Sequence, residues 1–111
     1  MKIAIVQTKP VINEIENNMR TILSFIDEAK EQEAQLICFP EMAFNGYNFD
    51  NLEWQVNQQK KYLNLLQGKA KIDNMTIVIG GIEKVADRYY LAQYVIDDSI
   101  RSYNKIHIGS K

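Results

Sequence analysis

The sequence predicts an α/β domain in which two helices cover a mixed β-sheet. Apolar runs of strand length at 3–6, 36–39 and 75–79 are separated by two longer segments whose apolar residues recur at the helical period. Strands that alternate with helices in this way are typical of parallel β-α-β units. Two more strand-like runs, 89–96 and 100–103, lie on either side of a short polar turn. We therefore expect an antiparallel hairpin to extend the sheet.

The first half of the chain has the pattern of one β-α-β unit. The run Ile3–Val6 does not alternate with polar residues, which predicts a strand buried on both faces. Asn13 and Glu16 have the spacing of a capping box, so we expect the first helix to begin there. Its apolar stripe consists of Ile15, Met19, Ile22, Phe25, Ile26 and Ala29. The strand Leu36–Phe39 follows, and the connection should be a right-handed parallel crossover.

The second half predicts another helix, a strand and the hairpin. Either Asp50 or Asn51 is suited to cap the second helix, and Gly68 should loosen its last turn. The stripe of this helix consists of Leu52, Val56, Leu63, Leu66 and Ala70, with Gln59 interrupting it. The next strand, Met75–Ile79, runs into the diglycine Gly80-Gly81.

Length and composition favour one soluble globular domain over residues 1–111. With 46% hydrophobic and 24% charged residues, the chain of 111 residues has enough apolar side chains for one core. The only cysteine excludes an internal disulfide, and no apolar run approaches the length of a membrane span. Both observations favour a cytoplasmic protein.

The balance of charges excludes two classes of partner. Thirteen basic and fourteen acidic side chains give a formal net charge of -1, with no basic run beyond Lys60-Lys61. Binding to nucleic acid or to an anionic membrane requires a basic patch, which this pattern lacks. We expect a small, roughly neutral molecule as the ligand.

Glu41 is the first candidate for chemistry. Pro40 cannot donate to a sheet ladder, so the strand ends beside it and places Glu41 at the strand's carboxyl end. In α/β sheets, ligands and catalytic groups collect at that edge, where loops vary without disturbing the core. A lone glutamate after a strand is more often a solvated loop residue, so the assignment depends on a partner.

Three segments together resemble a known family. They are Phe39-Pro40-Glu41 with Gly46-Tyr47, then Gly80-Gly81-Ile82, then Tyr103-Asn104-Lys105-Ile106-His107-Ile108. In this order they resemble the N-terminal portion of the nitrilase superfamily, the carbon-nitrogen hydrolases. The resemblance implies an α-β-β-α sandwich, of which this chain forms an incomplete half with a mixed sheet and two helices. It also implies hydrolysis of an amide, a carbamoyl compound or, more rarely, a nitrile, without a metal or organic cofactor.

The resemblance assigns roles to two residues of a Glu-Lys-Cys triad. Glu41 matches the general base, and a carboxylate in a partly desolvated pocket has its pKa raised toward the working pH. Lys105 matches the triad lysine, whose positive charge stabilises a developing oxyanion. Without the family motif, Lys105 reads as an edge-strand lysine that discourages aggregation. Many family members have an asparagine in the strand before the lysine, where this chain has Leu91-Ala92-Gln93-Tyr94.

The third member of the triad is not matched. The family's cysteine lies downstream of the lysine, so we expect residues 1–111 to be truncated before the nucleophile-bearing strand and to be inactive alone. Cys38 precedes Glu41 inside an apolar strand, and we expect a buried, inert thiol there because a reactive thiolate needs an electropositive, accessible setting.

The remaining candidates have structural alternatives of similar weight. Phe44, Tyr47 and Phe49 would line a substrate pocket or simply pack the loop. His107 should share a strand face with Lys105, and a hydrogen bond near the site is favoured over catalysis. One histidine without clustered ligands argues against a metal site. The diglycine lacks the companions of a nucleotide-binding loop, so no cofactor is expected.

Two other functions remain open on the sequence. The chain is either a non-catalytic module that oligomerises or binds another protein through an uncovered sheet face, or one half of a split amidohydrolase. In the split enzyme, a partner polypeptide supplies the cysteine. The expected partners are accordingly a small amide substrate and either further copies of this chain or the missing C-terminal part.

Overall fold

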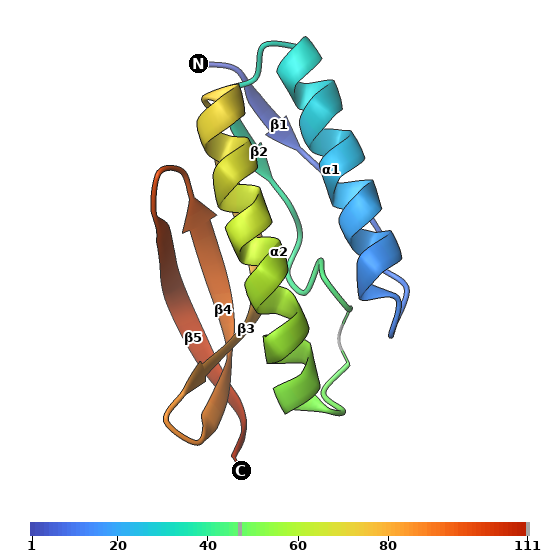
Figure 1. Ribbon diagram of the computed structural model, residues 1–111, viewed down its shortest axis with the longest axis vertical. Coiled ribbons are helices and arrows are strands. Elements are labelled where there is room, and N and C mark those ends of the chain that lie inside the picture. Colours follow the sequence, from blue (N-terminus) through green and yellow to red (C-terminus); the bar gives the residue numbers. More distant parts are fainter. Residues whose placement is uncertain (47, 111) are drawn as a thin grey trace.

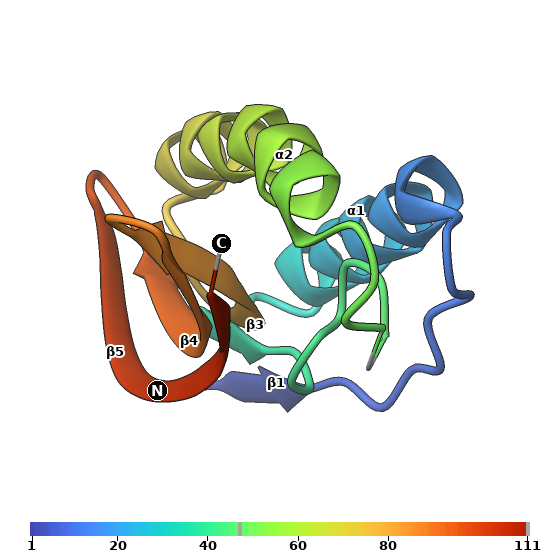
Figure 2. The same cartoon turned by 90° about the horizontal axis from the view of Figure 1, so that it is seen from below.

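A computed structural model describes residues 1–46 and 48–110, with the side chains of Asn104, Lys105 and Ser110 outside the description. The elements in chain order are β1 (Ile3–Ile5), α1 (Ile15–Glu31), β2 (Leu36–Cys38), α2 (Leu52–Asp73), β3 (Thr76–Val85), β4 (Arg88–Ile96) and β5 (Ile100–Ser110). The two helices lie side by side over one face of the sheet (Figures 1 and 2).

The five strands of the described residues form one mixed sheet in the order β1-β2-β3-β4-β5. β1 pairs with β2 and β2 with β3 in parallel, and the remaining neighbours are antiparallel. The predicted β-α-β unit and the hairpin are therefore confirmed. One helix layer on one sheet layer is half of the α-β-β-α sandwich that the sequence resemblance implies.

The main core lies between the helices and the sheet. The central strands contribute Ile37, Ile77 and Ile79, which are fully buried. Most of the α1 stripe and the C-terminal part of the α2 stripe face them, with Ile22 and Ile26 among the most buried side chains. Leu52 and Val56 of α2 pack instead in a second, smaller cluster. Burial of apolar surface on this one side is the main force that holds the two layers together.

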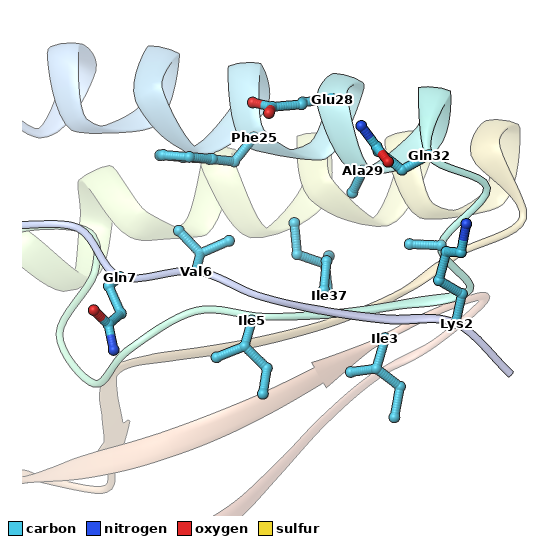
Figure 3. Close-up of a pocket in the computed structure, with 12 residues that line it drawn as sticks. Lys2, Ile3, Ile5, Val6, Gln7, Phe25, Glu28, Ala29, Gln32 and Ile37 are labelled. Atoms are coloured by element: carbon cyan, nitrogen blue, oxygen red, sulfur yellow. The ribbon is translucent and has the colours of Figure 1, made fainter.

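The prediction that the first strand is buried on both faces is wrong. Ile3 and Ile5 are 52% and 78% exposed, because they lie on the sheet face opposite the helices (Figure 3) and no described element covers that face. Cys38 pairs with Ile5 across the sheet and is half-buried rather than buried, for the same reason. The apolar run Ile3–Val6 therefore places apolar side chains on both faces of the strand, but the described residues bury only the face toward the helices.

The predicted helix starts are only partly correct. Glu14, not Asn13, is the N-cap of α1, and its side chain makes no capping hydrogen bond. Asn13 has a φ of 66°, and its side-chain oxygen accepts a hydrogen bond from Asn48. Asn51 does stand at the N-cap of α2, again without a side-chain capping bond. None of the helices in the described part of the chain is long and apolar enough to cross a membrane.

α2 continues regularly through Gly68 to Asp73, so the expected loosening at Gly68 is not seen. The two later strands are also longer than the sequence suggests. β3 runs through Gly80-Gly81 to Val85, and β5 runs from Ile100 to Ser110.

Gln59 explains why a polar residue interrupts the apolar stripe of α2. The side chain is 4% exposed, and its carboxamide pairs with both backbone groups of Ile82 in β3. The Ile82 N–H donates to Oε1 at 2.9 Å, and Nε2 donates to the Ile82 carbonyl at 2.6 Å. Tyr94 donates its hydroxyl to the same carbonyl at 2.8 Å, and burial raises the pKa of this phenol, so the donor stays protonated. α2 is thereby fastened to β3 just after the diglycine.

Candidate active site

Glu41 is held in place by a close contact between two backbones. The chain leaves the sheet after Phe39, whose N–H donates to the Val78 carbonyl of β3 at 2.8 Å, and it then crosses over Gly80. A Cβ at Gly80 would lie 2.7 Å from the Glu41 Cα and 3.0 Å from the Met42 nitrogen. The first distance is shorter than real Cβ contacts, and the second is tighter than nearly all of them. Glycine at position 80 is therefore what allows the backbone of Glu41 to rest on β3.

The loop after Glu41 is anchored from the other side by asparagines. Asn45 is 1% exposed, and its Oδ1 accepts a hydrogen bond from the Asn13 N–H at 2.5 Å. Asn18 of α1 donates to the Phe44 carbonyl at 2.8 Å. The Gly46 N–H closes a turn on the Met42 carbonyl at 2.7 Å. A candidate catalytic side chain on a loop with these anchors has a defined position, which general acid–base chemistry requires.

The Glu41 side chain is exposed and borders two cavities. The smaller, of about 110 Å³, is lined by Glu41, Met42, Gly80, Gly81, Leu91, Ala92, Gln93 and Ile106. The larger, of about 350 Å³, is lined by Thr8, Lys9, Pro10, Ile12, Pro40, Glu41 and Gly46. The partly desolvated pocket predicted for this carboxylate is therefore not formed by the described residues alone.

The backbone of Lys105 lies in a β-bulge beside the smaller cavity. Gln93 of β4 pairs with Tyr103, whereas Leu91 pairs with Ile106. Ala92 alone on β4 therefore faces the two residues Asn104 and Lys105 on β5. Bulges reorient side chains and are common next to active sites. The Lys105 side chain is outside the described residues, and its pairing with Glu41 stays a prediction.

The other sequence candidates have different surroundings. Phe44 is 3% exposed and packs in the main core, which is the structural alternative considered for it, and Phe49 is 45% exposed. His107 is exposed on β5, and its ring lies 5.5 Å from that of Tyr90. Tyr47 lies outside the described residues. Neither Phe44 nor His107 lines the cavities that Glu41 borders.

Cys38 also lines neither of those two cavities, although it stands at the end of β2. Its carbonyl accepts the Val6 N–H at 2.9 Å, which holds it in the ladder between β1 and β3. Among residues 1–46 and 48–110, no cluster of three or more His, Cys, Asp or Glu side chains could hold a metal ion.

A separate cavity of about 360 Å³ lies at the free edge of β1, under α1. Figure 3 shows Val6 and Ile37 pointing toward α1, while Ile3 and Ile5 point to the opposite side of the sheet. Glu41 does not line it, and its few polar side chains are those of Lys2, Gln7, Glu28 and Gln32. We interpret it as the uncovered edge of the sheet and not as the reaction site.

Two residues at the site were not singled out by sequence reasoning. Gly80 belongs to the family-like segment Gly80-Gly81-Ile82, but the sequence assigned it no contact with Glu41, although a glycine inside a strand also signals a close backbone approach. Gln93 was noted only as part of a stretch that departs from the family pattern, and no local signal places it next to Glu41.

The fold and the site together define an α/β domain with a carboxylate positioned at the carboxyl end of a parallel strand. The family model for carbon-nitrogen hydrolases matches residues 2–110, so the chain belongs to that family. The resemblance seen in the sequence is confirmed.

Curated relatives include nitrilases and larger synthetases. The chain is 33% identical over 115 residues to a nitrilase of Pyrococcus abyssi, covering 97% of this chain and 44% of the relative. It is 31% identical over 107 residues to a glutamine-dependent NAD(+) synthetase of Acinetobacter baylyi, covering 94% of this chain and 20% of that protein. The chain therefore spans less than half the length of these relatives.

A solved structure confirms the fold. An amidase from Nesterenkonia sp. AN1, a variant determined in complex with butyramide, superposes with a TM-score of 0.82 at 23% identity. The match covers 100% of this chain and 45% of the amidase. At this level of identity, the likeness shows that the chain has the nitrilase-type fold.

Replacing Gly80 tests the contact beneath Glu41. We expect Gly80→Ala to lower the free energy of unfolding by about 1–3 kcal/mol, because the added methyl group forces Glu41 off the strand. Gly68→Ala is the matched control: nothing lies within 4 Å of its Cβ position on α2, so it should stabilise the protein by about 0.5–1 kcal/mol. Urea denaturation measures both. Equal effects of the two substitutions would contradict the assigned contact.

Proposed function

We propose that this chain supplies the general base and the lysine of a Glu-Lys-Cys triad in an amidase-type carbon-nitrogen hydrolase. The substrate is a small non-peptide amide or carbamoyl compound. The observation that carries the proposal is the position of Glu41, seated on Gly80 next to the bulge that contains Lys105. Membership in the carbon-nitrogen hydrolase family, with nitrilase relatives, supports the same chemistry.

The proposed reaction proceeds in two halves. Glu41 takes the proton from a cysteine thiol while the sulfur attacks the amide carbon, and the Lys105 ammonium stabilises the oxyanion of the tetrahedral intermediate. Glu41 then gives the proton to the departing nitrogen, which leaves as ammonia or an amine. In the second half, Glu41 takes a proton from water, the hydroxide attacks the thioester carbon, and the carboxylic acid is released with return of the proton to sulfur.

The nucleophilic cysteine comes from outside residues 1–111 in this proposal. Cys38 is the only cysteine of the sequence, and it lines neither cavity beside Glu41. The nucleophile is then supplied either by a C-terminal continuation of the same domain or by a partner polypeptide. Relatives more than twice as long as this chain favour the first source. The isolated chain is expected to be inactive.

Ammonia release from butyramide tests the proposed roles of Glu41 and Lys105. The protein is purified from its own cells, so that any segment or chain joined to it is retained. Butyramide is chosen because the Nesterenkonia amidase variant was solved with it. We expect Glu41→Gln to reduce kcat at least about 100-fold, because the amide cannot accept the thiol proton. Lys105→Met should cause a loss of similar size, since the oxyanion loses its positive charge.

Cys38→Ser is the discriminating control. It should leave the rate of ammonia release within about twofold of the parent, because in this proposal Cys38 does not contact the reacting atoms and its loss leaves the activation free energy nearly unchanged. A loss with Cys38→Ser as large as that with Glu41→Gln would overturn the assignment of the nucleophile. Full activity in Glu41→Gln would overturn the proposed function itself.

A second function, that of a non-catalytic interaction module, is favoured by the uncovered sheet face. Ile3, Ile5, Tyr103 and Ile106 are each between 48% and 78% exposed. Such side chains on one sheet layer favour association with another protein surface or with a second copy of the chain. Absence of ammonia release by the parent protein in the assay above would favour this function over the hydrolase.

Substitution of Ile5 tests this second function. If copies of the chain associate through the open face, Ile5→Lys should shift the protein to the monomer position in size-exclusion chromatography, because a buried unpaired charge is strongly unfavourable. Ile72→Lys on α2 is the matched control, since Ile72 is 81% exposed on the helix surface and should not change elution. A parent chain that elutes as a monomer at all concentrations and melts cooperatively would count against self-association.

A further inference from the structure

Gln93 lies next to Glu41 across the sheet. The register pairs Gln93 of β4 with Gly80 of β3 on one side and with Tyr103 of β5 on the other. Side chains of directly paired residues point to the same face of a sheet. Gly80 has no side chain, and the Glu41 Cα occupies the space where one would be. Gln93 and Glu41 therefore border the same cavity, on the two sides of Gly80.

Among the side chains that the structure describes, these two are the polar ones that line the smaller cavity. Its other lining side chains are methionine, leucine, alanine and isoleucine, together with two glycines. Gln93 is half-buried, and no hydrogen bond to its carboxamide is found among the described residues. A carboxamide has two donor hydrogens and an acceptor oxygen, so Gln93 presents both kinds of group to whatever fills the cavity.

We propose that Gln93 is a specificity-determining residue that recognises the carboxamide of the substrate, an inference that rests on the proposed function. Gln93 Nε2 donates to the carbonyl oxygen of the ligand, and Gln93 Oε1 or the Glu41 carboxylate accepts from its NH₂ group. A carboxylate ligand lacks the N–H donors and is repelled by Glu41, and an ester lacks the donors only.

The apolar residues that line the rest of the cavity determine which acyl group of the ligand can bind. Met42, Leu91 and Ile106 present apolar surface beside the two polar groups. Short alkyl groups bury favourably against such a surface, whereas a charged or strongly polar substituent loses its hydration there. The ligand class that fits is a primary amide with a small aliphatic acyl group.

Titration of the 111-residue chain with butyramide, butyrate and methyl butyrate, followed by ¹H–¹⁵N NMR, tests the proposal. We expect butyramide to shift the backbone amides of Gly80, Gly81 and Ala92 saturably, and the acid and the ester to bind at least about threefold more weakly. Gln93→Met should weaken butyramide binding about three- to tenfold, because it keeps the length of the side chain and removes its hydrogen bonds.

Two further variants keep the result interpretable. Gln35→Met makes the same chemical change at an exposed position before β2 and should bind butyramide as the parent does. Gln93→Glu retains the shape and the acceptor but loses the donors, so it also should weaken binding even if Gln93→Met fails to fold.

The proposal is overturned if the parent chain does not bind butyramide saturably, if it binds butyrate equally well, or if both Gln93 variants bind like the parent. The proposed function has its own test in ammonia release by Glu41→Gln. Selective amide binding together with full hydrolysis by Glu41→Gln would overturn that function and leave the role of Gln93 standing. Loss of hydrolysis in Glu41→Gln together with unchanged binding in the Gln93 variants would support the proposed function and overturn the role of Gln93.

Discussion

The contact of the Glu41 backbone with Gly80 is the constraint on which the candidate site depends. Because position 80 has no side chain, the loop after β2 rests directly on β3, with the Glu41 Cα where a Cβ would otherwise be. Gln59 and Tyr94 hold the same strand at Ile82 from the helix side. The backbone contact at Gly80 and the hydrogen bonds at Ile82 therefore hold β3 and the loop that carries Glu41 in a fixed arrangement. Acid–base catalysis requires such preorganisation.

The sheet is covered by helices on one face only, and this links the stability of the chain to its proposed function. α1 and α2 cover one face (Figure 2), while Ile3 and Ile5 on the other face (Figure 3) are exposed to solvent. Glu41 is exposed as well among the described residues. In the proposed enzyme, the segment that brings the cysteine also excludes water from Glu41. Covering the sheet and completing the active site are then a single event.

The sequence predicts the elements well and their surroundings poorly. Helical stripes and apolar runs located both helices and all five strands, because they reflect burial on the one face that the described residues cover. The capping box at Asn13 failed because the side chain bonds to Asn48 in a distant loop instead. The exposure of Ile5 was missed for a similar reason, since a local pattern does not tell which second layer is present.

For the candidate site, Glu41 was found from its position after Pro40 and from the family motif, whereas its neighbours were not. The cross-strand pairing of Gln93 with Gly80 and the bulge opposite Ala92 arise from the register of three strands. Register depends on turn geometry and on packing between segments that are distant in the sequence. Phe44 illustrates the same limit, because its aromatic side chain suits a pocket and a core equally and only packing decides between them.

The most direct test of the central claim is zero-length carbodiimide cross-linking of the 111-residue chain, followed by peptide mapping with mass spectrometry. Carbodiimide joins a carboxylate to an amine only where the two are in contact. Glu53 and Lys84, 2.9 Å apart, provide an internal positive control. If Glu41 and Lys105 form one site, an amide bond between them should appear and should be absent from Glu41→Gln. Formation of the Glu53–Lys84 product while Glu41 couples only to Lys9 would contradict the claim.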